Sequence, residues 1–258
     1  RVAATWDDCA AALTDGLEPL SRAWGIVGHL HAVNDVPGWR DAYNRMLPEV
    51  SRFYAEVGQN LQLFAKYKAI AASSEFAGLS AARRRIVKHE IRDFRLAGAE
   101  LPEDQKPRFQ AISEELSQLS AKFSENLLDA TNAFSETVTD ESELAGLPED
   151  ARQAAREAAE KDGQAGWKFT LHMPSYLPVM QYADSRRLRA AMFRAYATRA
   201  AEFGAAELDN TPLIRQILLL RREEAQMLGY ANFAEVSLVP KMAESIPQVL
   251  GFLRDLAV

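Results

Sequence analysis

Apolar residues recur every three or four positions through the first part of the chain, and this spacing is typical of one face of an α-helix. The pattern predicts a helix over about residues 5–34 and a second helix that starts at Pro37 and continues to about Phe64. A third helix is expected over about residues 80–97, because the Ser80 side chain can accept a hydrogen bond from a backbone amide of its first turn.

The longest helical pattern lies between about residues 102 and 135. Its apolar residues step by three or four throughout, and they are Phe109, Ile112, Leu116, Leu119, Phe123, Leu127, Ala130 and Phe134. A narrow stripe of this kind is expected to pack against long neighbouring helices. A coiled-coil dimer seam is the alternative, because the same stripe can face outward.

The pattern changes after Ser135. Residues 135–140 favour a strand, and residues 167–173 alternate apolar and polar side chains, as a half-buried strand does. We expect these two segments to pair antiparallel, with a short helix between them that ends near Lys161. Helices are predicted again in three later segments, over about residues 184–202, 211–229 and 246–258.

Two prolines, Pro174 and Pro178, follow the second predicted strand. Proline fixes φ and restricts the residue before it, so the segment around Tyr176 is predicted to be extended and rigid. The fold class that follows is mainly α, with long antiparallel helices and a small antiparallel β element at about residues 135–140 and 167–173. No repeat or low-complexity linker divides the sequence, so a single helical unit is expected.

Composition narrows the function classes. The chain has 258 residues and a formal net charge of −6, which argues against binding to bulk nucleic acid or to an anionic membrane. The basic run at residues 83–85 is read as a solvated helix face, with a nucleic-acid patch as the alternative. Cys9 is the only cysteine, so a reducing, cytoplasmic location is expected. The helical pattern continues through Leu256 without a stop signal, and we therefore expect a fragment of a longer protein.

Residues 88–94 (KHEIRDF) come close to a zinc-peptidase motif. His-Glu-x-x-His on a helix places two metal-binding histidines one turn apart, but Asp93 stands here where the second histidine would be. At about 100° per residue, the apolar arc of this helix consists of Ile86, Val87, Ile91 and Phe94. His89 lies about 140° and Asp93 about 100° from the centre of this arc. Both therefore lean toward the polar face, among cations that would weaken a metal site. The pattern favours a contact between His89 and Asp93 on a solvated face.

The remaining candidate side chains do not match a known catalytic arrangement. His29 and His31 point apart on a helix, and His172 is expected on a strand. The carboxylates of Glu223 and Glu224 are adjacent in sequence and therefore diverge on a helix. Nucleophile-elbow, phosphate-loop and reactive Cys/His motifs are missing from the sequence. The sequence thus predicts no catalytic, cofactor-binding or metal-binding residue in this chain.

Several stretches resemble, in the same order, segments of one protein family. They are residues 24–34 (WGIVGHLHAVN), 92–98 (RDFRLAG), 126–131 (NLLDAT), 137–147 (TVTDESELAGL), 173–180 (MPSYLPVM), 193–199 (FRAYATR) and 238–244 (LVPKMAE). By these segments the whole chain resembles the N-terminal half of the thimet-oligopeptidase-like zinc metallopeptidases.

The resemblance implies a mainly helical zinc endopeptidase that cleaves short peptides inside a narrow channel between its two halves. The zinc-binding His-Glu-x-x-His helix, the third carboxylate ligand and the residues that stabilise the transition state belong to the C-terminal half of the family. They have no counterpart in residues 1–258. This chain is therefore expected to form one channel wall, to contact the catalytic half across a large interface, and to hold no zinc and show no activity alone.

Two other hypotheses compete with this interpretation. The first is a helical interaction module without an enzymatic role, which would use the stripe of residues 102–135 to bind protein partners. The second is a self-sufficient metalloenzyme with a metal at His89 and Asp93. Zinc content and peptidase activity of the chain, alone and with the missing half, would separate the three.

Overall fold

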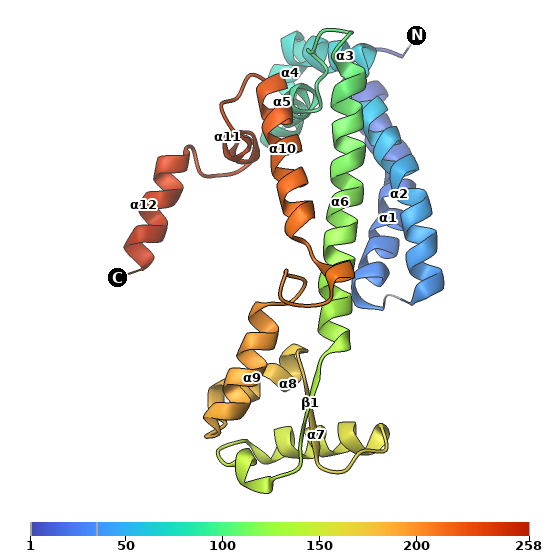
Figure 1. Cartoon of the computed structure of the whole chain (residues 1–258). Helices are drawn as coiled ribbons and strands as arrows, with labels where there is room; N and C mark the ends of the chain where they lie inside the picture. The colour runs from blue at the N-terminus through green and yellow to red at the C-terminus, as the bar shows by residue number, and fades with distance from the viewer. Residues whose placement is uncertain (1, 35, 258) are drawn as a thin grey trace. The chain divides into compact units, whose positions relative to one another are not determined.

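A computed structural model describes residues 2–34 and 36–257, most of which lie in helices (Figure 1). The backbone forms two units, each with its own hydrophobic core: unit 1 consists of Arg1–Leu119 and Ile217–Val258, and unit 2 of Ser120–Gln216. The sequence indicated a single helical unit. The structure instead divides the chain into two units. The sequence did not reveal this division, because the first boundary falls inside an uninterrupted helix, where no change of composition marks it.

Unit 1 is helical throughout its described secondary structure. Its elements are a π-helical turn (Trp6–Ala11), α1 (Ala12–Val33), α2 (Pro37–Gly58), α3 (Leu61–Ala72), α4 (Ser74–Gly78), α5 (Ala81–Leu96), the first part of α6 (Lys106–Ala133), most of α10 (Thr211–Met227), α11 (Phe233–Leu238) and α12 (Ile246–Leu256). The helices predicted over residues 5–34, 80–97 and 102–135 are confirmed. Within the described residues no helix has the length and apolar character needed to cross a membrane.

The second predicted helix is interrupted, because the chain breaks between α2 and α3. The Asn60 side chain accepts hydrogen bonds of 3.0 Å from the backbone amides of Gln62 and Leu63, and so caps a new helix. Just before the break, Gly58 packs against Ala97, and a Cβ at residue 58 would lie 2.7 Å from the Ala97 Cβ. Apolar periodicity alone could not reveal this break, since it runs through both helices.

The core of unit 1 lies between α3 and α5. Phe64 and Tyr67 of α3 are buried, and both rings contact Phe94 of α5, with centroids 5.6 and 5.7 Å apart. Val87 is fully buried on the same face of α5, as predicted. Ile86, which belonged to the predicted apolar arc, is instead 44% exposed. Aromatic contacts of this kind add to the stabilisation from buried apolar area.

Within unit 1, α6 is held by charged contacts on both sides. Arg52 of α2 bonds Glu114 at 3.2 Å, and Arg108 donates two hydrogen bonds of 2.6 Å to Glu223 of α10. Phe109, at the start of the predicted stripe, is 3% exposed. The first turns of the stripe thus face neighbouring helices of the same chain.

Unit 2 combines a two-stranded sheet with helices. Its elements are β1 (Ser135–Val138), a 3₁₀ turn (Glu141–Leu144), α7 (Glu149–Lys161), β2 (Trp167–Thr170), α8 (Met173–Tyr182), α9 (Arg186–Ala197) and a second 3₁₀ turn (Ala206–Leu208), together with the end of α6. The strands are antiparallel, with Ser135 opposite Thr170 and Val138 opposite Trp167, so the predicted β element is confirmed. Val138, Trp167 and Phe169 are buried on the core side of the sheet, as strand alternation requires.

The segment that follows β2 was predicted to be extended, and that prediction was wrong. Residues 173–182 form α8. Pro174 lies in its first turn, where the missing amide would have no helical partner. Pro178 lies inside the helix and removes one backbone hydrogen bond. Burial of Tyr176 and Val179 in the core of unit 2 offsets that loss, a tertiary effect that the local sequence did not reveal.

Candidate functional site

The near-match to a zinc motif lies on α5, but the side chains have other partners. The two carboxylate oxygens of Asp93 accept hydrogen bonds of 2.7 and 3.0 Å from Arg92. The Nε2 atom of His89 accepts a hydrogen bond of 3.4 Å from Arg85. The predicted contact between His89 and Asp93 is thus replaced by two separate pairs with arginines.

The intervening residue of this motif, Glu90, is half-buried. Burial, followed by the nearby Asp93 carboxylate, raises the pKa of Glu90, while Arg92 acts in the opposite direction. Burial also raises the pKa of Tyr67, to which the Glu90 charge contributes. Among residues 2–34 and 36–257, no three His, Cys, Asp or Glu side chains come together in a group that could hold a metal ion.

The other histidines are dispersed. His29 is exposed on α1, whereas His31 is 8% exposed and stacks on Tyr43 of α2 with ring centroids 4.0 Å apart. His172 is exposed just before α8. The sequence separated His29 from His31 correctly, but placed His172 on a strand that ends at Thr170.

Unit 2 contains a stack of aromatic and cationic groups that sequence reasoning missed. The rings of Tyr176 and Tyr196 are stacked with centroids 4.2 Å apart, and the Arg199 guanidinium lies 3.7 Å from the Tyr196 centroid. Burial and then Tyr196 raise the pKa of Tyr176, while Arg199 acts against them. The sequence predicted an extended segment around Tyr176 and a helix over residues 184–202, and neither pattern indicates that the two segments form a stack.

Large apolar side chains are exposed on two helices of unit 1. On α10, Leu218 and Leu219 are each 59% exposed. All residues of α12 keep at least partial exposure, and Phe252, Leu253 and Leu256 are more than half exposed. Exposed apolar side chains that share one helix face, as Phe252 and Leu256 do, are typical of a surface that contacts another protein segment.

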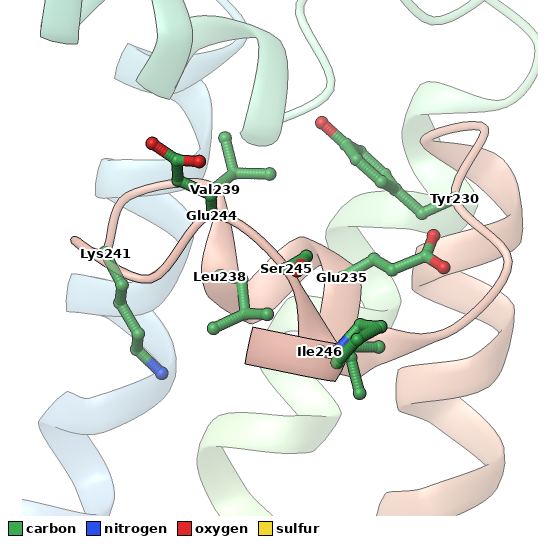
Figure 2. A pocket seen from close by; sticks show the side chains of 9 residues that line it. Tyr230, Glu235, Leu238, Val239, Lys241, Glu244, Ser245 and Ile246 are labelled. Atoms are coloured by element: carbon green, nitrogen blue, oxygen red, sulfur yellow. The ribbon is translucent and has the colours of Figure 1, made fainter. Parts of the chain in front are cut away.

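A pocket of about 550 Å³ lies next to the exposed helix α12. Figure 2 shows Tyr230 and Glu235 on one side of the view and Lys241 on the other. The Glu235 carboxylate accepts a hydrogen bond of 3.0 Å from the amide of Ala231, and Lys241 donates one of 2.6 Å to Ser237. The polar groups of the pocket are thus engaged mainly within its own short loops and helix α11.

Comparison with known proteins identifies the family of the chain. Residues 1–106 match the model of the neurolysin/thimet oligopeptidase N-terminal domain, and residues 179–258 match that of peptidase family M3. Oligopeptidase A of Haemophilus influenzae is 45% identical over 98% of this chain, and oligopeptidase A of Escherichia coli 42% over 98%. The chain belongs to peptidase family M3. It spans only 37% of the Haemophilus protein and 38% of the Escherichia coli protein.

The match also extends beyond bacteria. A probable cytosolic oligopeptidase A of Arabidopsis thaliana is 41% identical over 97% of the chain, which spans 37% of that relative. The expected resemblance to the thimet-oligopeptidase-like family, and to oligopeptidase A within it, is therefore confirmed along the whole chain. Helices α10 and α12, which carry the exposed apolar side chains, both lie within residues 179–258, the part that matches the family M3 peptidase model.

Proposed function

We propose that this chain is the N-terminal helical region of a zinc-dependent oligopeptidase, residues 1–258, which hydrolyses short peptides internally. The observation that carries the proposal is the 45% identity to oligopeptidase A over 98% of the chain. The proposed role of the chain is to form one wall of a narrow channel that admits short peptides and excludes folded proteins. The proposed location is the cytoplasm, which the single cysteine supports.

The proposed partner of this wall is the catalytic half of the same enzyme. The exposed apolar side chains of α10 and α12 support this, because contiguous apolar surface tends to be covered by another protein segment. On α12 the exposed residue Leu256 lies four positions after Phe252 and three after Leu253, so the three side chains share one face. A helix with one apolar face is suited to packing against a further helix.

Among residues 2–34 and 36–257, no group of side chains fits a zinc site. His89 and Asp93, the closest match to a ligand pair, are each bonded to an arginine, and no third ligand is near them within the described residues. We therefore assign zinc binding, and the metal-assisted attack of water on the peptide bond, to residues outside this chain. The wall would instead position peptides and limit their length.

The proposal is tested by measuring zinc content and hydrolysis of an internally quenched short peptide. The first sample is this chain alone. The second is this chain mixed with the C-terminal part of Haemophilus influenzae oligopeptidase A, which lacks the region that this chain matches. We expect neither stoichiometric zinc nor hydrolysis in the first sample, and zinc-dependent hydrolysis in the second.

A matched variant separates this proposal from the metalloenzyme alternative. His89→Ala removes the only histidine of the near-match and should leave the activity of the mixed sample unchanged. Zinc bound by the chain alone and lost in His89→Ala would overturn the proposal. A mixed sample that forms a stable complex without hydrolysis would favour the interaction-module hypothesis instead.

A further inference from the structure

Unit 2 contains a pocket of about 260 Å³ whose wall is mostly apolar. It is bordered by the end of α6, the end of α9 and the loop that follows α9, and all its lining residues belong to unit 2. Apolar side chains, both small and large, dominate the wall, among them Ala130, Ala133, Phe134, Leu171, Ala195 and Leu208. Arg199 is the one ionisable residue in the lining.

The Arg199 side chain is held in a defined position. Its Nε donates a hydrogen bond of 3.0 Å to the backbone carbonyl of Tyr196, and its Nη1 donates one of 3.0 Å to the Thr131 hydroxyl. The ring of Tyr196 lies against one face of the guanidinium. Thr131 is itself fixed, because its hydroxyl also donates to the carbonyl of Leu127 at 2.7 Å.

The guanidinium nevertheless lacks an anionic partner. Within the described residues, no carboxylate forms an ion pair with Arg199, and its Nη2 makes no hydrogen bond. The side chain is only partly exposed. A cation that is partly withdrawn from water and unpaired is unfavourable, and a guanidinium is suited to bind a carboxylate through two parallel hydrogen bonds.

The backbone next to Arg199 is also unusual. Ala200 has φ of 49°, a left-handed conformation that L-residues other than glycine and asparagine seldom adopt. Its carbonyl accepts a hydrogen bond of 2.9 Å from the amide of Asn210, which is buried. This contact holds the loop of residues 198–210 closed around the pocket, so the cation is positioned before any ligand arrives.

We propose that this pocket binds a single carboxylate group carried on a small apolar body, with Arg199 as the anion-binding residue. Its volume of about 260 Å³ lies below the range of about 300–1,000 Å³ that is usual for drug-sized ligands, so it suits one residue rather than a stretch of peptide. The C-terminus of a peptide and an acidic side chain both supply this chemistry. The site goes beyond the proposed function, since carboxylate binding to unit 2 requires neither zinc nor hydrolysis.

The test is a titration of the ¹⁵N-labelled chain, following the backbone amides of Arg199 and Ala200 by NMR. The probes are N-acetyl-leucine, its neutral analogue N-acetyl-leucinamide, and N-acetyl-glutamic acid α-amide, which carries a side-chain carboxylate only. We expect a dissociation constant in the millimolar range for at least one acid, and binding of the neutral amide weaker by about tenfold or more. A preference for N-acetyl-leucine assigns the pocket to a chain end, and a preference for the glutamate derivative assigns it to an acidic side chain.

Two variants test the site itself. Arg199→Gln should abolish the preference for acid over amide. Ala133→Leu fills the pocket from an exposed position without touching the contacts of Arg199, so it keeps the test valid if Arg199→Gln fails to fold. It should weaken binding by about tenfold. Ala197→Leu, exposed on α9 and outside the lining, is the matched control and should bind as the parent does.

The proposal is overturned by any of three results. These are the absence of shifts at Arg199 and Ala200 with both acids up to about 50 mM, affinity for the neutral amide equal to that for the better-binding acid, and unchanged affinity in Ala133→Leu. Each would show that the guanidinium is a structural contact of the loop and not a ligand site.

Discussion

Two asparagines are buried in unit 2 and share a hydrogen bond, yet their removal should have unequal costs. Asn126 of α6 is 2% exposed and Asn210, just before α10, is 3% exposed. The Nδ2 of Asn126 donates to the Oδ1 of Asn210 at 2.9 Å, and the Nδ2 of Asn210 donates to the carbonyl of Phe123 at 3.0 Å. The Oδ1 of Asn126 has no hydrogen-bond partner among the described residues.

The magnitudes follow from what each substitution leaves behind. Asn210→Ala leaves the buried amide donor of Asn126 without a partner, which costs about 1–3 kcal/mol. It also removes the hydrogen bond to the Phe123 carbonyl, which costs about 0.5–1.5 kcal/mol more. Asn126→Ala leaves the Oδ1 of Asn210 without a hydrogen-bond donor, which is unfavourable, but it also removes the unpartnered buried Oδ1 of Asn126, which is favourable. These two contributions to the free energy of unfolding largely cancel. Both variants delete the same atoms, and their packing losses are therefore similar. We expect Asn210→Ala to cost about 2 kcal/mol more than Asn126→Ala.

The assay is thermal and urea unfolding of the parent, both single variants and the double variant. In 5-fluorotryptophan-labelled protein, the ¹⁹F resonance of Trp167 reports unit 2, since the other tryptophans lie in unit 1. A difference of about 2 kcal/mol corresponds to about 4–8 °C between the two single variants. Equal destabilisation, or a larger loss in Asn126→Ala, would refute the reasoning. The double-variant cycle should give a coupling of about 0.5–3 kcal/mol.

Three further predictions concern backbone strain, pH dependence and association. Ala200→Gly should leave the free energy of unfolding in urea nearly unchanged, because relief of the left-handed φ offsets the greater entropy of the unfolded chain. The control Ala190→Gly, on the exposed face of α9, should lower that free energy by about 1 kcal/mol. Glu90→Gln should stabilise the chain at pH 7, because burial raises the pKa of Glu90 in the folded state and the ionised carboxylate therefore opposes folding. This effect is present above the unfolded pKa of Glu90, about 4.5. The unfolding curves of variant and parent should therefore converge as the pH falls below that value. The isolated chain should self-associate through α12, and Leu253→Glu with Leu256→Glu should reduce its apparent mass in light scattering; a parent that is already monomeric at high concentration would contradict this.

Helices could be predicted wherever local pattern and local capping agree. At α5, for example, the Ser80 hydroxyl accepts a hydrogen bond from the amide of Arg83, as its position before the apolar pattern indicated. The antiparallel strands were also recognisable, since alternation buries Trp167 and Phe169 on one face.

Features that depend on distant partners could not be predicted from the same patterns. The break after α2 lies beside a close contact of Gly58 with Ala97, 39 positions later in the sequence. Helix α8 persists through Pro178 because its apolar side chains are buried in a core formed by other elements. The stack of Tyr176, Tyr196 and Arg199 likewise joins two helices, so no local spacing reveals it.

The near-match KHEIRDF illustrates the difference between spacing and chemistry. Spacing places His89 and Asp93 one turn apart on α5, which is necessary for two ligands of one metal but leaves their other partners undetermined. Arg92 precedes Asp93 and holds both of its carboxylate oxygens, while Arg85 bonds the imidazole of His89. A dication would have to displace one guanidinium and approach several others, and the Coulomb cost of that approach opposes binding. Charged neighbours on the same helix thus oppose a metal here, and the family resemblance of residues 92–98 does not require a metal at His89.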